Sequence, residues 1–105
     1  MSVNPHRGEV AVTLDGRPYA ARLTLGALAA LETDLGAESL VAVIERFESG
    51  RFSSRDIMAV LVAGLRGAGW DGRADDLLTA EIGGGPVGAA RAAAELLARA
   101  FHGAA

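Results

Sequence analysis

Alternating apolar and polar residues predict a β-hairpin near the start of the chain. From residue 8 onward, an extended segment places Val10, Val12 and Leu14 on one face. Asp15-Gly16 follows, a dipeptide favoured in two-residue turns where both residues need a positive φ. A second extended run comes next, so we expect the hairpin to occupy residues 8–23.

After the hairpin, apolar residues recur every three or four positions, the spacing of helices that bury one face. This spacing predicts helices over residues 25–35, 39–48, 73–82 and 87–102, and a third helix that follows Ser53 or Ser54 and contains the apolar run 57–65. Thr24 stands where an N-cap accepts a backbone hydrogen bond, and Gly36 stands where a helix commonly ends. The pattern therefore predicts an α+β fold, an N-terminal β-hairpin followed by four or five helices in a small helical bundle.

The length of 105 residues corresponds to one domain. We expect that domain to span residues 1–105, with a loose leader over 1–7, the hairpin over 8–23 and the helical part over 24–102. Half of the residues are hydrophobic and 22% are charged, which is a composition typical of globular proteins.

The third helix is unusual because its middle is apolar on every side. It follows Ser53 or Ser54 as the cap and reads IMAVLVAGL over residues 57–65, without a charged side chain. A helix of this kind must be covered on all sides. Either it is the central helix of the domain, or one of its faces belongs to a partner.

The C-terminal third carries two further expectations. The last helix has an apolar face, made of Val87, Ala90, Ala94, Leu97 and Phe101, opposite Arg91, Glu95 and Arg99. Trp70 lies in a glycine-flanked loop, where it could be an interface hot spot or a lid over the core. We favour the lid.

Charge and composition argue against several classes of function. The formal net charge is −3, all ten basic residues are Arg, and they form no run, which disfavours nucleic-acid binding. Cysteine is absent, so neither disulfides nor thiol chemistry are expected. The N-terminal segment lacks the apolar stretch of a signal peptide, and no apolar run approaches the roughly 20 residues of a membrane span. We expect a cytoplasmic protein without a membrane partner.

The sequence predicts no catalytic residue, cofactor site or metal site. His6 and His102 stand near opposite ends of the chain, without partners at metal-ligand or catalytic spacing. The glycine-rich segment EIGGGPVG at residues 81–88 lacks the Lys-Ser/Thr ending of a P-loop and follows a predicted helix. We interpret it as a turn between helices, and we expect the protein not to be an enzyme.

Four segments together resemble a known family. They are NPHRGEV at residues 4–10, LDG at 14–16, LTLGALAALE at 23–32 and VLVAGLRGAG at 60–69. The chain resembles a small protein encoded among the tail genes of gene transfer agents and related siphophages, described as a tail assembly chaperone and, in older descriptions, as a tail tube protein. The resemblance covers nearly the whole chain and weakens after about residue 72.

This resemblance implies a non-enzymatic role in building a long tail inside the bacterial host cell. Such chaperones are thought to coat the apolar, helical tape measure protein until tail tube subunits replace them. The implied partners are therefore the tape measure protein, the tail tube protein and further copies of this chain. Binding a helical client calls for an apolar groove.

We expect partner contacts on the third helix first and on the second helix next. The predicted contact residues are Ile57, Met58, Leu61, Val62 and Leu65, followed by Val41, Ile44 and Phe47.

Two alternatives remain open. A structural tail tube subunit would polymerise and stay in the particle, but such subunits are normally built on closed β-sheet and this sequence predicts one hairpin. A small helical DNA-binding regulator is disfavoured by the acidic balance and by the lack of an Arg-lined recognition helix.

Overall fold

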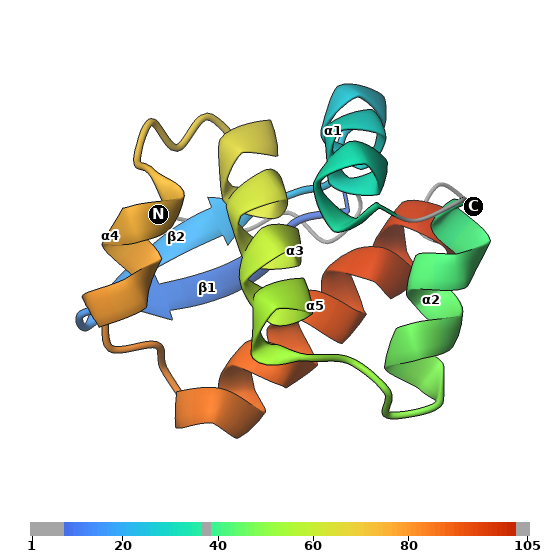
Figure 1. Cartoon of the computed structure of the whole chain (residues 1–105). Coiled ribbons are helices and arrows are strands. Elements are labelled where there is room, and N and C mark those ends of the chain that lie inside the picture. The colour runs from blue at the N-terminus through green and yellow to red at the C-terminus, as the bar shows by residue number, and fades with distance from the viewer. Residues whose placement is uncertain (1–7, 37–38, 103–105) are drawn as a thin grey trace.

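The computed structural model describes residues 8–36 and 39–102, and the leader predicted over residues 1–7 lies outside them. Within the described part, a two-stranded hairpin precedes five helices, which confirms the predicted α+β fold (Figure 1). The elements are β1 (Val10–Leu14), β2 (Arg17–Ala21), α1 (Leu25–Leu35), α2 (Leu40–Glu48), α3 (Ser54–Gly67), α4 (Ala74–Thr79) and α5 (Gly85–His102).

The hairpin forms as its sequence predicts. β1 and β2 are antiparallel, with a register that runs from Val10 opposite Ala21 to Leu14 opposite Arg17. The turn residues Asp15 and Gly16 have φ values of 50° and 80°, as a two-residue turn of this type requires. The face predicted to be apolar, Val10, Val12 and Leu14, is buried against the helices.

Residues 81–83 pair with the end of β1, on the side away from β2. The amide of Gly83 donates to the carbonyl oxygen of Thr13 at 2.9 Å, and Leu14 and Ile82 form an antiparallel bridge. At the turn, the amide of Asp15 donates to the carbonyl oxygen of Glu81 at 2.8 Å. These bonds satisfy backbone groups that an edge strand would otherwise expose, so this end of β1 is not open to another strand.

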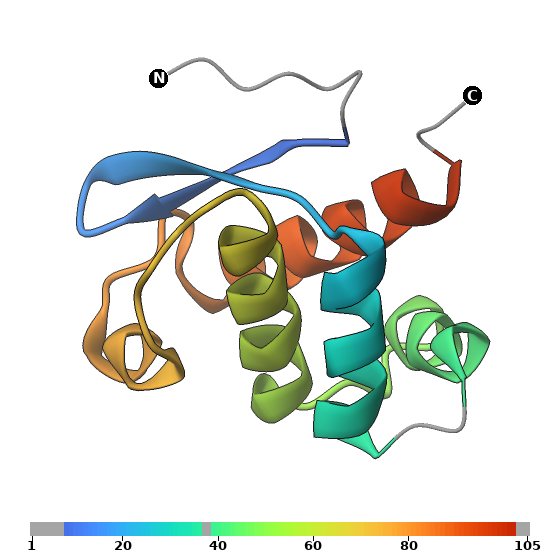
Figure 2. The same ribbon diagram turned by 90° about the horizontal axis from the view of Figure 1, so that it is seen from above.

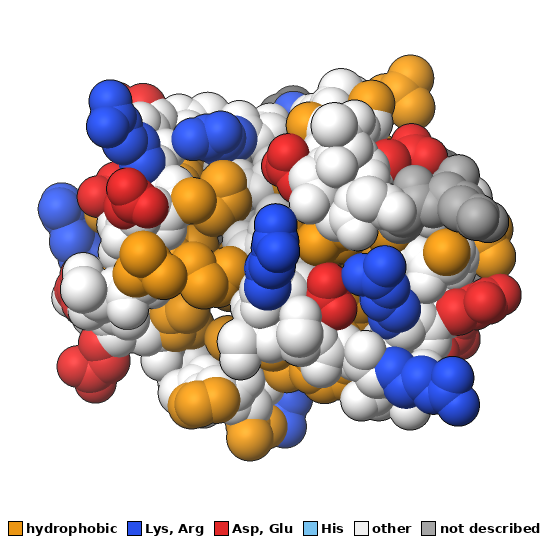
Figure 3. All heavy atoms as spheres, viewed as in Figure 1, with side chains coloured by type: hydrophobic (Ala, Val, Ile, Leu, Met, Phe, Trp, Pro, Cys, Tyr) orange, Lys and Arg blue, Asp and Glu red, His pale blue; other side chains and the backbone are white. Residues whose placement is uncertain are grey.

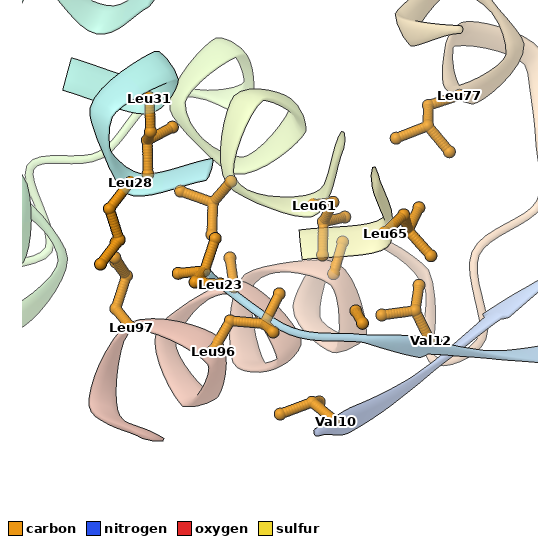
Figure 4. Packing of buried hydrophobic residues seen from close by; sticks show 14 of the residues in the cluster. Val10, Val12, Leu23, Leu28, Leu31, Leu61, Leu65, Leu77, Leu96 and Leu97 are labelled. Carbon is orange, nitrogen blue, oxygen red and sulfur yellow. The ribbon is translucent and has the colours of Figure 1, made fainter. Parts of the chain in front are cut away.

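α3 is the central helix, packed against α1, α4, α5 and β2. Seen from above, α1 and α3 lie side by side, with α4 beyond α3 and α2 beyond α1 (Figure 2). Val60, Leu61 and Leu65 of α3 have no exposed surface and meet Leu31 of α1 and Leu96 of α5 in the core (Figure 4). The central-helix interpretation is therefore correct for this face of α3.

α4 is shorter than the helix predicted over residues 73–82. It ends at Thr79, because Ile82 belongs to the bridge with β1. Trp70, in the loop before α4, packs partly buried against the core, and its amide donates to the carbonyl oxygen of Leu65 at 2.9 Å. This position agrees with the lid interpretation.

The apolar face predicted for the last helix is not the face that α5 buries. The buried residues are Ala89, Ala93, Leu96 and Leu97, whereas Val87 is 68% exposed and Phe101 is 42% exposed. Alanine is small enough to let α5 approach β1 and α3 closely, and it occurs on both faces of the helix. Of the predicted face, Leu97 is buried at its border, and Val87 and Phe101 lie on the solvent side of α5.

An ion pair joins the start of α3 to α2. The Asp56 carboxylate, 6% exposed, accepts hydrogen bonds from Arg46 Nη1 at 3.0 Å and from the Ser53 amide at 2.9 Å. The Ser53 hydroxyl oxygen accepts in return from the Asp56 amide at 3.1 Å, which completes a capping box.

Asp56→Asn is expected to lower the free energy of unfolding by about 1–2 kcal/mol. The Asn side chain lacks the negative charge that the Arg46 guanidinium and the N-terminus of α3 both stabilise. Urea denaturation measures the change. Asp75→Asn provides the control, since Asp75 is exposed in the first turn of α4 and its carboxylate has no hydrogen-bond or ion-pair partner among the described residues. Equal stability of the two variants would show that the Asp56 contacts contribute nothing measurable.

Candidate partner-binding surface

A groove runs along the outer face of α3, between the end of α1 and α4. We call it the α3 groove; its apolar lining is Leu35, Met58, Ala59, Val62, Ala74 and Leu78. Its charged lining is Asp34, Arg55 and Arg66, and its volume is about 560 Å³. Figure 3 shows this face, where hydrophobic side chains gather between α3 and α4 with Arg side chains beside them.

The α3 groove exists because α3 is apolar beyond the face that it buries. Positions 55, 58, 59, 62 and 66 follow the three- and four-residue spacing that places side chains on one face of a helix. Met58 and Val62 are half-buried, and Leu78 on α4 is 65% exposed. The helix that the sequence shows as apolar on every side thus has one side covered by the core and one side open to solvent.

A second groove lies between α2 and α5. This α5 groove is lined by Ile44, Phe47, Glu48, Ala94, Leu97, Ala98 and Phe101, with a volume of about 270 Å³. Phe47 is held by stacking on Phe52, with 5.0 Å between the ring centroids. Ala94 and Phe101, from the outward face of α5, supply its second wall.

The structure does not bring the predicted contact residues together on one surface. Met58 and Val62 line the α3 groove, whereas Ile44 and Phe47 line the α5 groove. Val41 is 58% exposed on α2, and Ile57 is half-buried against the core. Leu61 and Leu65 have no exposed surface. These two residues belong to the core, so the partner-contact residues that we consider below do not include them.

Sequence reasoning did not assign Leu35, Leu78, Ala98 or Phe101 to a contact surface, although all four line one of the grooves. The sequence did indicate Phe101, since it belongs to the predicted apolar face of the last helix, which α5 turns toward solvent. The indication for Leu78 was weaker: Leu77 and Leu78 are adjacent in a short helix, and adjacent helical residues cannot both face the core.

The described residues contain no group of three or more His, Cys, Asp or Glu side chains arranged to hold a metal ion. No helix among them is long and apolar enough to cross a membrane. The two apolar grooves are surfaces that a partner could use.

Comparison with protein families matches residues 7–103 to the family described as phage tail tube protein, GTA-gp10. The chain belongs to this family. The match spans the hairpin and all five described helices, so the elements that form both grooves lie within the matched region. It also confirms the resemblance to gene transfer agent tail proteins.

The comparison with curated proteins found no match, and the comparison with solved structures found none. The description of the GTA-gp10 family names a structural part of a phage tail rather than an enzyme.

Proposed function

We propose that this GTA-gp10 family member is a non-enzymatic tail assembly chaperone. It holds an apolar helix of the tape measure protein in the α3 groove within the host cytoplasm, until tail tube subunits replace it. The observation that supports this proposal is the open apolar stripe of the central helix, at Met58, Ala59 and Val62, between two flanking helices.

The shape and chemistry of the α3 groove suit a helical client. A partner helix lying along α3 would cover the exposed part of Leu78 and the half-buried side chains of Met58 and Val62. Complete burial of one such side chain stabilises by about 1.5–3 kcal/mol, and partial burial by less. After the costs of association, this gain supports binding that is specific enough to hold a client and weak enough to be reversed.

A structural tail tube subunit is the second candidate, and the description of the family favours it. Against it stands the sheet, which in the described residues has two strands. Tube subunits are normally built on closed β-sheet, and here the end of β1 is already paired with residues 81–83 of the same chain. A DNA-binding regulator receives no support from the net charge of −3.

Co-expression with the tape measure protein tests the proposal. The chain carries an affinity tag, and light scattering measures the mass of whatever co-purifies. A soluble complex containing a tape measure protein that is insoluble when expressed alone is the expected result. Rings or tubes formed by the chain alone, with no tape measure protein bound, would establish the tail tube candidate instead.

A further inference from the structure

The charges of the α3 groove differ in sign from those of the chain as a whole. The chain carries a formal net charge of −3, whereas the groove is lined by two Arg and one Asp, a net charge of +1. Arg55 and Arg66 are eleven residues apart on α3, which is about three helical turns or about 16 Å. Both are exposed, and the apolar residues of the groove lie between them.

Neither of these Arg side chains is held by an ion pair within the described residues. Arg66 Nη2 makes one weak contact with the carbonyl oxygen of Gly72 at 3.5 Å, and the Arg55 side chain has no hydrogen-bond or ion-pair partner among the described residues. Elsewhere on the described helices, Arg46 pairs with Asp56, and Arg99 pairs with Glu95. The guanidinium groups of Arg55 and Arg66 are thus available to carboxylates of another molecule, which they can bind in bidentate geometry.

The two ends of the groove are not equivalent. Asp34, at the end of α1, lines the groove and also lines a neighbouring hollow together with Arg55. Its carboxylate repels a partner carboxylate that approaches Arg55. No acidic residue lines the groove beside Arg66 among the residues described. The Arg66 end should therefore attract a carboxylate more strongly than the Arg55 end.

We propose that the α3 groove selects a particular kind of client segment: an amphipathic helix whose apolar stripe is bounded by carboxylates about eleven residues apart. This inference rests on the proposed function. The apolar stripe of such a helix would pack against the apolar residues of α3, and its two carboxylates would lie near Arg55 and Arg66. Apolar contact supplies most of the affinity, and the two Arg side chains supply selectivity and register.

Two synthetic helical peptides test this selectivity directly. Both carry the same Leu and Ala stripe, and they have either Glu or Lys at two positions eleven residues apart. Fluorescence anisotropy measures the dissociation constant of each peptide at low and high salt. The Glu peptide is expected to bind about tenfold more tightly, with a difference that shrinks as salt screens the charges.

Charge reversal of the protein provides the second arm. Arg66→Glu is expected to weaken binding of the Glu peptide about five- to tenfold, and Arg55→Glu is expected to weaken it less. The double variant should bind the Lys peptide better than the unmodified chain does. Arg91→Glu is the matched control, since Arg91 is exposed on α5 and lines neither groove. Circular dichroism confirms that each variant is folded.

Equal affinity for the two peptides would overturn the proposal, as would equal losses in Arg66→Glu and Arg91→Glu. In either case, continued co-purification of the tape measure protein would leave the chaperone function standing without charge selection. Failure of both peptides to bind would also overturn the selectivity, and the co-expression experiment would then decide the function by itself.

Discussion

Met58→Glu combined with Val62→Glu is expected to eliminate co-purification of the tape measure protein while the chain remains folded. Both side chains are half-buried in the middle of the α3 groove, where a longer Glu side chain can still reach water in the free protein. A docked helix would strip that water from two carboxylates, at a cost of at least about 3 kcal/mol, which corresponds to more than about 100-fold in affinity.

Ala98→Glu is the matched control for this double variant, because Ala98 is an exposed lining residue of the α5 groove. We expect it to retain the tape measure protein. Loss of binding in Ala98→Glu, with binding retained in the double variant, would move the client to the α5 groove. A double variant that fails to fold would show that Met58 and Val62 serve the core instead of a partner.

Gly67→Ala is expected to have the largest effect on stability. A Cβ atom at Gly67 would stand 2.0 Å from the carbonyl oxygen of Arg22, far inside the contact distance. That backbone cannot move away freely, because the Arg22 amide donates to the carbonyl oxygen of Gly64 at 2.7 Å. We expect a loss of more than about 3 kcal/mol in the free energy of unfolding, since overpacking against backbone forces the end of α3 away from β2.

Gly26→Ala is the control for Gly67→Ala, because both glycines lie within helices. At Gly26 the nearest atom to an added Cβ is Thr24 Oγ1 at 4.0 Å, so the methyl group fits without strain. The substitution should raise the free energy of unfolding by about 0.5–1 kcal/mol through the better helix propensity of alanine. Urea denaturation curves of equal midpoint for the two variants would contradict the close packing of α3 against the Arg22 backbone.

Local chemistry made the N-terminal half predictable. The Asp15-Gly16 turn and the ends of α1, from Thr24 to Gly36, depend on neighbouring residues that the sequence displays directly. The Thr24 hydroxyl oxygen accepts from the Ala27 amide at 3.1 Å, and Gly36 has a φ of 60°. Signals of this kind need no knowledge of the tertiary structure.

The orientation of α3 could not be predicted, because the run over residues 57–65 has no polar position to mark the solvent side. In α5 the charged residues Arg91, Glu95 and Arg99 mark one side, but alanines around the rest of the helix leave the buried face undefined. In the run over residues 57–65, Leu61 and Val62 are equally apolar, yet the first is buried and the second lines the α3 groove. Gly64 was a usable signal. An added Cβ there would lie 2.8 Å from Leu96, so this glycine marks the face of α3 that meets α5.

The grooves themselves depend on which helices become neighbours. The α3 groove requires the end of α1 on one side and α4 on the other, and residues 34 and 78 are far apart in the sequence. The exposure of Leu78 follows from the direction in which α4 docks through Leu77. Such placements arise from packing across the whole domain and leave no pattern in one segment.

The pairing of β1 with residues 81–83 links folding to the order of synthesis. The hairpin is among the first described segments to leave the ribosome, but the segment that covers the end of β1 follows almost seventy residues later. Until then, the carbonyl oxygen of Thr13 and the amide of Asp15 remain unpaired by that segment. A nascent chain stopped before residue 81 would therefore present a bare strand end to neighbouring chains, and synthesis through residue 83 supplies the segment that covers it.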